Sequence, residues 1–284
     1  MSEMISSYKR TNEILEKYHL RFKKGYGQNF IIEPTIVSKI ASLSHCEGSA
    51  VIEIGPGIGA LTQQLAMLSK KVLAFEIDRK LINVLKDTLS EYDNVGVVNE
   101  DFLNVNLEEI SEELFLKYNN VVVCANLPYY ITTPILFKVF ESNTKIDKIT
   151  VMVQKEVAER FSADASSSDY NALSVITQYL YDVKIVMKVP NTVFMPRPKV
   201  DSAVIQFSKK DFKEEIDRND FFNFVKGCFK QRRKTLYNNL KEIIVDKELI
   251  EKIYVESNLD MNIRAQQLTL DQFILIFKIY GKYK

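Results

Sequence analysis

The chain has 284 residues, of which 38 are Lys or Arg and 37 are Asp or Glu, so its formal net charge is +1. This length allows a substantial core and two domains, and the near balance of charge limits any nucleic-acid-binding surface to a local patch. No apolar stretch approaches the ~20 residues of a membrane span. Three scattered cysteines and two histidines offer little material for a metal site, so we expect no metal and a reduced, cytoplasmic protein.

The first 24 residues are polar and include several basic side chains. We expect residues 1–24 to form a flexible basic arm that becomes ordered when RNA or cofactor binds. Seven short apolar runs then predict strands at 51–54, 72–76, 95–99, 121–125, 149–153, 183–189 and 202–207. Helical spacing of leucines between the early runs predicts an α/β domain, with a mostly parallel sheet covered by helices on both faces.

The last two predicted strands have no helical pattern between them, because residues 190–201 contain three prolines. We therefore expect these two strands to pair antiparallel at one end of the sheet. From Phe221 to Tyr280, aromatic and aliphatic residues recur at helical spacing. This pattern predicts a small all-α domain of about four helices over residues 210–284, after an α/β domain over residues 25–209.

A glycine-rich loop follows the first predicted strand, in the sequence Gly55-Pro56-Gly57-Ile58-Gly59. Glycines allow a tight turn and a close approach of the backbone to a ligand. The dinucleotide pattern needs one more residue before its last glycine. The loop therefore favours a nucleoside ligand without phosphates, such as S-adenosylmethionine, over a pyrophosphate.

Acidic residues follow the next two predicted strands. Glu76 is placed to accept from ribose hydroxyls, and Asp78 fits better as the cap of a helix that starts near Arg79. Asp101 can accept from an adenine amino group while Phe102 packs on the ring, although an exposed loop acid is the simpler interpretation of Asp101 alone. Together with the glycine loop, these strand ends predict a nucleoside site.

Asn126-Leu127-Pro128-Tyr129 directly follows the apolar run at 121–125. At the carboxyl end of a strand, the Asn amide oxygen can accept from an amine, Pro fixes the backbone and Tyr can stack on a planar base. The alternative interpretation of this stretch is that the Asn caps a helix and the next residues form an ordinary turn. The nucleoside site beside it favours a clamp for an amine-bearing base.

These motifs resemble the class I methyltransferases that methylate adenine N6 in ribosomal RNA. Further segments at 27–30, 194–204 and 231–236 identify the chain as similar to the KsgA/RsmA family of small-subunit rRNA adenine dimethyltransferases, from about Lys24 to the carboxyl end. The resemblance implies a class I (Rossmann-like) domain with a seven-stranded sheet and S-adenosyl-L-methionine as the cofactor. It also implies dimethylation of two adjacent adenines near the 3′ end of 16S rRNA, in the 30S subunit or its precursor, by a monomer that serves ribosome biogenesis.

The resemblance also assigns site residues. It implies cofactor contacts at Gln28, Asn29, Ile31, Gly55, Glu76, Asp101 and Asn126, and the loops add Gly57, Gly59, Ile77 and Phe102. The catalytic set is Asn126, Leu127, Pro128 and Tyr129, with Phe194 as the ring that opposes Tyr129. Tyr130 stands where the family usually has Asn, and this departure puts the shape of the target-base pocket in doubt.

A basic run marks the predicted helical domain, and its members are Lys226, Lys230, Arg232, Arg233 and Lys234. No acidic residue lies between 226 and 240. A charge run is usually a solvated helix face, but an unbalanced patch repels itself unless a polyanion binds. We therefore expect these residues to contact RNA phosphates.

Three other functions compete with this one. The related macrolide-resistance methyltransferases act on 23S rRNA and typically have Ile at the position of Leu127. A nucleotide-dependent dehydrogenase would need a different glycine spacing. A non-catalytic assembly factor that binds immature subunits is the third, and it can coexist with catalysis.

Overall fold

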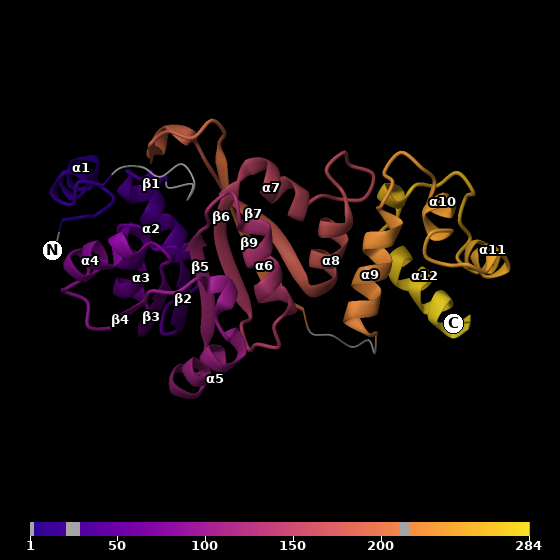
Figure 1. Cartoon of the computed structure of the whole chain (residues 1–284), viewed down its shortest axis with the longest axis horizontal. Helices are drawn as coiled ribbons and strands as arrows, with labels where there is room; N and C mark the ends of the chain where they lie inside the picture. The colour runs from indigo at the N-terminus through magenta and orange to yellow at the C-terminus, as the bar shows by residue number, and fades with distance from the viewer. Residues whose placement is uncertain (1–2, 21–28, 211–215, 284) are drawn as a thin grey trace. The chain divides into compact units, whose positions relative to one another are not determined.

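The computed structural model describes residues 3–20, 29–210 and 216–283. The chain forms two compact units, one of Met1–Ala158 and Lys184–Lys209 and the other of Glu159–Val183 and Lys210–Lys284 (Figure 1). The second unit therefore takes a segment from inside the range 25–209, which the sequence assigns to one domain.

A sheet of seven strands forms the centre of the α/β part (Figure 1). Its strands are β2 (Ala50–Ile54), β3 (Lys71–Phe75), β4 (Val95–Val98), β5 (Val121–Asn126), β6 (Lys148–Gln154), β7 (Tyr181–Val189) and β9 (Ser202–Lys209). The order is β4-β3-β2-β5-β6-β9-β7, in which β4 to β6 pair in parallel and β9 runs antiparallel to β6. The predicted seven-stranded, mostly parallel sheet is confirmed, with β7 and β9 as neighbours at one end.

Helices separate most of these strands in the chain. They are α2 (Pro34–Leu43), α3 (Ala60–Leu68), α4 (Arg79–Thr88), α5 (Leu107–Tyr118), α6 (Thr132–Glu141) and α7 (Lys155–Phe161), with 3-10 turns η2 (Phe102–Asn104) and η3 (Asn191–Val193). The start of α4 is set by Asp78, whose side chain accepts from the Lys80 N–H at 3.2 Å, as predicted. A two-stranded sheet of β1 (Phe30–Ile31) and β8 (Phe194–Met195) was not predicted.

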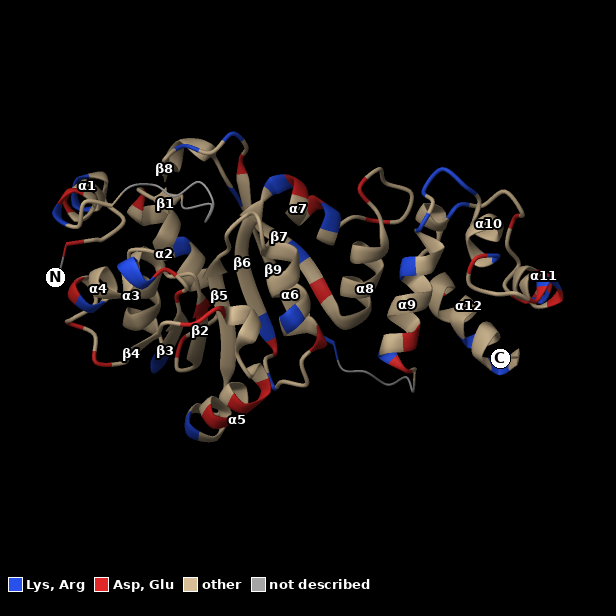
Figure 2. Cartoon of the chain, viewed as in Figure 1, with Lys and Arg blue, Asp and Glu red and all other residues tan. Residues whose placement is uncertain are grey.

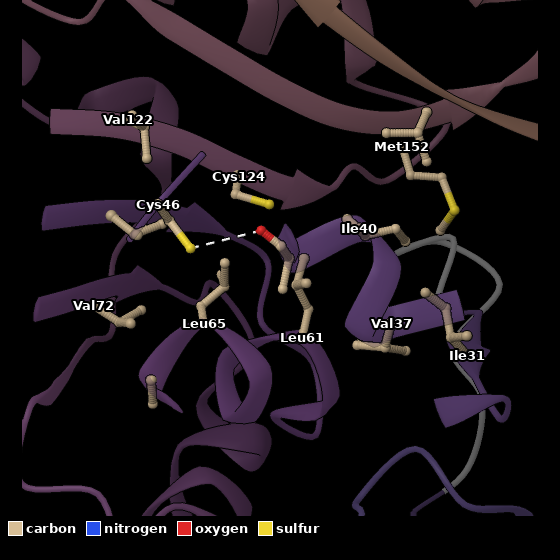
Figure 3. Packing of buried hydrophobic residues seen from close by; sticks show 14 of the residues in the cluster. Ile31, Val37, Ile40, Cys46, Leu61, Leu65, Val72, Val122, Cys124 and Met152 are labelled. Carbon is tan, nitrogen blue, oxygen red and sulfur yellow. Dashed lines mark hydrogen bonds between the residues drawn. The ribbon is translucent and has the colours of Figure 1, made fainter. Parts of the chain in front are cut away.

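A hydrophobic core lies where α2 and α3 pack against the sheet (Figure 3). Val122 and Cys124 of β5 belong to this cluster, together with Ile40 of α2 and Leu65 of α3. Alternate residues of a strand face opposite sides of the sheet, and Val121 and Val123 of β5 are buried as well. Burial on both faces explains why this strand reads as one continuous apolar run.

The described part of the amino-terminal segment is a docked helix, α1 (Tyr8–Lys17). Ile5 and Ile14 are each 2% exposed and pack in a cluster with Ile58 and Leu85. The Ile5 N–H donates to Gln63 Oε1 at 2.9 Å. The prediction of a flexible arm is therefore wrong for residues 3–20, because their apolar side chains are buried; residues 21–24 lie outside the described residues.

The second unit is mainly helical in its described residues and also takes in the first three residues of β7. Its helices are α8 (Ala172–Leu180), α9 (Arg218–Cys228), α10 (Leu236–Leu240), α11 (Lys247–Glu256) and α12 (Leu270–Tyr283), with the 3-10 turn η4 (Ala265–Gln267). Its core is aromatic: the Tyr179 and Phe221 rings lie 4.7 Å apart, and the Phe229 and Phe273 rings stack at 5.6 Å. The predicted helical region is confirmed, and α8 joins it. No helix in the described ranges is long and apolar enough to cross a membrane.

Candidate active site

A pocket opens at the carboxyl ends of β2, β3 and β5, and it holds about 1040 Å³ of space, counting the solvent at its mouth. Most of the predicted site residues line it: Asn29, Ile31, Gly55, Gly57, Glu76, Ile77, Asp101, Phe102, Asn126, Leu127, Pro128 and Tyr129. Gly59 and Phe194 do not line it, and Gln28 lies outside the described residues. The fold thus gathers loops from several strand ends at one site.

The glycines of the first loop serve different purposes. Gly55 and Gly57 have φ angles of 68° and 63°, and a Cβ on Gly57 would lie 3.1 Å from Cε1 of Phe30. Both positions therefore favour glycine at the pocket wall. Gly59, with φ of 92°, caps α3, and a Cβ there would lie 3.2 Å from Leu89 Cδ2. The third glycine allows close packing next to α4 and does not line the pocket.

Glu76 links the glycine loop to the start of α4. Its Oε2 accepts from the Gly57 N–H at 3.2 Å, and its Oε1 accepts from the Asp78 N–H at 2.8 Å. The side chain is 5% exposed. Burial raises the pKa of Glu76, and the two backbone hydrogen bonds oppose that rise. Because the lone pairs of a carboxylate outnumber these two bonds, acceptor capacity remains for a ligand hydroxyl.

The third strand end carries Asp101 and Phe102. Asp101 Oδ1 accepts from the Leu103 N–H at 2.9 Å and so caps η2. Phe102 packs edge-to-face on Phe75 at 5.7 Å. Lys138 of α6 donates to the Leu103 carbonyl at 2.9 Å. These contacts hold the Phe102 ring against the pocket wall.

The loop after β5 is fixed at several points. Asn126 Nδ2 donates to the Asn29 carbonyl at 3.5 Å, so the side-chain oxygen is the group left to accept from an amine. The Leu127 N–H donates to the Met152 carbonyl of β6 at 3.0 Å. The Tyr129 hydroxyl lies 2.8 Å from Ser202 Oγ of β9, and burial raises the pKa of Tyr129. The Tyr129 ring is therefore neutral and tethered.

One aromatic residue, Phe194, differs from expectation. Phe194 of β8 pairs with Ile31 of β1, is 3% exposed and packs in the core with Ile31. The structure thus places Phe194 beside the pocket wall and not in the pocket, because the β1–β8 pairing buries its ring. Tyr130 does line the pocket and is 51% exposed.

A site residue that the sequence did not single out is Glu53. It lies within β2, lines the pocket and is 1% exposed. Its Oε2 has no hydrogen-bond partner in the described part of the chain. Burial raises its pKa to about 8. The available signal was a carboxylate inside an otherwise apolar strand, two residues before the first glycine of the loop.

The predicted RNA-binding run lies around the turn between α9 and α10, where Figure 2 shows a succession of basic residues. Lys230 pairs with Glu242 at 2.6 Å, and Arg232 Nη2 donates to the Ser168 carbonyl at 2.7 Å. Arg233 and Lys234 are exposed, and the structure gives neither an acidic partner among its described residues. Arg232, Arg233 and Lys234 therefore carry charge that no acidic side chain of the described residues balances, and Arg232 alone of the three donates to a carbonyl.

Within residues 3–20, 29–210 and 216–283, no group of three or more His, Cys, Asp or Glu side chains is arranged to hold a metal ion.

The family model for ribosomal RNA adenine dimethylase matches residues 19–282. The chain belongs to this family. It is a ribosomal RNA adenine dimethylase, and its cofactor is S-adenosylmethionine.

Two curated relatives show how far the likeness extends. The dimethylase is 46% identical over 280 residues to "Ribosomal RNA small subunit methyltransferase A" of Bacillus cytotoxicus, with 96% of each chain covered. It is 45% identical over 276 residues to the protein of the same name in Alkaliphilus oremlandii, covering 95% of this chain and 96% of that one.

Two solved structures share the fold of the dimethylase. A dimethyladenosine transferase from Plasmodium falciparum has a TM-score of 0.75 at 25% identity, covering 89% of this chain and 97% of that one. The 23S rRNA methyltransferase ErmE has a TM-score of 0.69 at 25% identity, covering 89% of this chain and 99% of that one. The predicted class I methyltransferase fold is confirmed.

The pocket of the dimethylase fits its cofactor on its own geometry. Gly57 has a positive φ angle, and a Cβ there would press on the Phe30 ring at 3.1 Å, so this point of the wall favours glycine. The buried Glu53 carboxyl has an unused oxygen, and Glu76 retains acceptor capacity. The pocket therefore combines acceptors for hydroxyls and for positive charge with the aromatic wall of Phe102.

Proposed function

We propose that this dimethylase modifies N6 of two adjacent adenines near the 3′ end of 16S rRNA, within the 30S subunit or its precursor. The observation that supports this choice is the 45–46% identity, along nearly the whole chain, to proteins named for the small subunit. The likeness to the 23S enzyme ErmE is 25%. Leu127, where the 23S enzymes typically have Ile, agrees with this choice.

The chemistry we propose depends on the loop after β5. The adenine amino lone pair is delocalised into the ring, which makes this nitrogen a poor nucleophile. Asn126 Oδ1 and the Leu127 carbonyl would accept its two hydrogens and draw the nitrogen toward tetrahedral geometry. The hydrogen bonds from Asn126 to Asn29 and from Leu127 to Met152 support this role, because they fix both acceptors.

When bound, the cofactor supplies a methyl group that is already activated for displacement. The protein therefore needs no strong base, and the proton can leave the nitrogen after transfer. Tyr129 would stack on the target base, which must leave its own stack to enter the pocket. The tether to Ser202 holds the Tyr129 ring for this contact. Phe194 remains the proposed opposing ring, a role that requires it to leave the cluster that it shares with Ile31.

The basic residues of the second unit would bind RNA phosphates and position the substrate. We propose Arg233 and Lys234 as the main contacts, with Lys226, Lys230 and Arg232 as neighbours. Lys230 already pairs with Glu242, and the Arg232 guanidinium already donates to the Ser168 carbonyl, so neither is as free as Arg233 and Lys234 to bind a phosphate. We further propose that the enzyme acts as a monomer in the cytoplasm, where small subunits are assembled.

The direct test is mass spectrometry of rRNA nucleosides after incubation with labelled cofactor and unmethylated small-subunit particles. We expect labelled dimethyladenosine in 16S rRNA and none in 23S rRNA from large subunits treated in parallel. Label in 23S rRNA alone would reject the proposed substrate. Asn126→Ala is the matched variant, and we expect it to bind cofactor but to lose at least about a hundredfold in transfer rate, as on removal of a group that acts on the reacting atom.

A further inference from the structure

The walls of the cofactor pocket carry charge of one sign. Four of the described lining residues are acidic: Glu53, Glu76, Glu100 and Asp101. None of the described lining residues is Lys, Arg or His. The pocket therefore favours a ligand that brings positive charge with it, because acidic side chains that line a cleft attract a cation.

Glu53 is the most deeply buried of the four. It lies in β2, where it pairs with Ala74 of β3, and its side chain is 1% exposed. The titratable and polar groups around it are Thr62 of α3, Glu76 beyond β3 and Cys124 of β5. None of these groups is a cation, and neither Glu53 Oε2 nor Thr62 Oγ1 has a hydrogen-bond partner among the described residues.

A carboxylate in these surroundings is strongly disfavoured. An ionised group that is buried without a partner costs several kcal/mol, and in proteins such a group usually takes up a proton instead. Burial raises the pKa of Glu53 to about 8; the nearby Glu76 adds to the rise, and the Thr62 hydroxyl opposes it. At neutral pH the free enzyme therefore holds Glu53 mainly as the neutral acid.

We propose that cofactor binding converts Glu53 from a neutral carboxylic acid to a carboxylate, with release of one proton to solvent. The O–H bond of the acid breaks, the proton passes to the buffer, and the new negative charge faces the positive charge that the cofactor brings. That charge can come from the sulfonium or from the α-ammonium of the cofactor. This inference concerns the cofactor alone and does not depend on which RNA is methylated.

The experiment is isothermal titration calorimetry of the full-length enzyme, without RNA, in buffers that differ in ionisation enthalpy. At about pH 6.5 the α-amino group of the cofactor is protonated, because such groups titrate near ~7.7–8.0. The dependence of the heat on the buffer then counts protons. We expect close to one proton released per cofactor for the wild type and close to none for Glu53→Gln.

The variant also decides between two sources of the proton, because burial raises the pKa of Glu76 as well. Release that is unchanged in Glu53→Gln would overturn the proposal and point to Glu76. No release in the wild type would overturn it too. The dissociation constant supplies a second readout: between about pH 6 and 7 it should fall about tenfold for the wild type and stay flat for Glu53→Gln, as one linked proton requires.

Three ligands separate the sources of positive charge. S-adenosylhomocysteine keeps the ammonium and lacks the sulfonium, and methylthioadenosine lacks both. Proton release with S-adenosylhomocysteine supports the proposal with the ammonium as the partner, and release with S-adenosylmethionine alone supports it with the sulfonium. Equal release with methylthioadenosine would overturn it, since no cation would then be required.

A spectroscopic measurement on the wild type keeps the test independent of how well the variant folds. Infrared difference spectra on addition of S-adenosylmethionine should show the loss of one protonated carboxyl band and the gain of one carboxylate band. A spectrum without that exchange would overturn the proposal.

Discussion

At the scale of single residues, Glu53 makes the stability of the free enzyme depend on pH. Its pKa in the folded state, about 8, lies above the ordinary 4.5, so the folded state retains a proton that the unfolded state loses. Its contribution to stability is complete at pH values below the unfolded pKa and is lost as the pH rises through the folded pKa.

We therefore expect Glu53→Gln, which cannot ionise, to be more stable than the wild type at about pH 8.5, and the difference to shrink toward about pH 5. Urea unfolding without cofactor measures this. Glu100→Gln, at an exposed position on the same pocket, is the matched control and should follow the wild type. Parallel pH curves for the wild type and Glu53→Gln would contradict the expectation.

Glu76 gives a prediction on cofactor affinity. Glu76→Gln replaces a carboxylate, which accepts from two backbone N–H groups and which we expect to accept from the ribose as well, with a neutral amide. Hydrogen bonds to charged groups contribute about 1.5–3 kcal/mol. We expect a loss of roughly 10- to 100-fold in cofactor affinity, measured by calorimetry, with RNA affinity unchanged.

The same variant separates catalysis from assembly by binding alone. Full small-subunit maturation with Glu76→Gln and no methylation would show that binding suffices. If Glu76→Gln bound the cofactor with unchanged affinity, Glu76 would not be a cofactor-binding residue.

The sequence predicted the site residues that occupy strand ends, because carboxyl ends of parallel strands meet at one edge. Gly55, Glu76, Asp101 and Asn126 were found in this way, and all four line the pocket. Glu53 was missed because it lies within a strand that otherwise reads as apolar. The burial of Phe194 could not be seen without the two-residue β1–β8 pairing.

At the scale of elements, α1 shows why a mixed-charge segment was misread. Lys9 lies 3.8 Å from Glu13 and 3.9 Å from Glu3, and Arg10 lies 3.1 Å from Glu13, so the basic residues are balanced locally. Figure 2 shows both signs on this helix. The apolar residues that dock it, Ile5 and Ile14, are too few and too widely spaced to predict burial from sequence.

Docking of α1 predicts a stability effect. Truncation of a buried Ile typically costs about 2–5 kcal/mol, so we expect Ile14→Ala to lower the free energy of unfolding by roughly 2–4 kcal/mol. Tyr8→Ala is the control, because Tyr8 is 61% exposed and surface changes cost less than about 0.5 kcal/mol. Denaturant unfolding compares them; equal stability of the two variants would mean that α1 contributes little.

The turn between α9 and α10 predicts an effect on RNA binding. Arg233→Ala with Lys234→Ala should weaken RNA binding and reduce its salt dependence by roughly two phosphate contacts, with cofactor affinity unchanged. Lys86→Ala with Lys247→Ala removes the same charge from other exposed positions. Filter binding across a salt series measures both. Equal losses of RNA affinity in the two double variants would mean that the basic residues of this turn are only a solvated surface and do not contact RNA.

At the scale of the whole molecule, the fold class was predictable and the division into units was not. Periodicity identified the strands of the sheet, and helical spacing identified α9 to α12. The packing of α8 with these helices could not be predicted from the sequence, because its partners lie far along the chain. The Tyr179 ring centroid lies 4.7 Å from that of Phe221 and 6.0 Å from that of Phe222.

This arrangement predicts that residues 210–284 do not fold alone. Without residues 159–183 the fragment lacks Tyr179 and also Tyr170, whose ring packs 6.1 Å from Phe229. We expect helical signal without a cooperative thermal transition, and we expect addition of a 159–183 peptide to restore one. A cooperative transition in the fragment by itself would contradict this prediction.

The position of β9 between β6 and β7 has a consequence for synthesis. Residues 148–154 of β6 leave the ribosome about 50 residues before their neighbour β9, at 202–209. In that interval the β6 edge lacks its final partner. The helix α8 has also been made, but the carboxyl-terminal helices against which it packs have not. Neither unit is continuous in the chain, so the first unit cannot close before residue 209 has been made, and residues 159–183 need the later segment 210–284 to complete the second unit. Nascent chains of this enzyme should therefore depend on chaperones that shield the β6 edge until β9 has emerged.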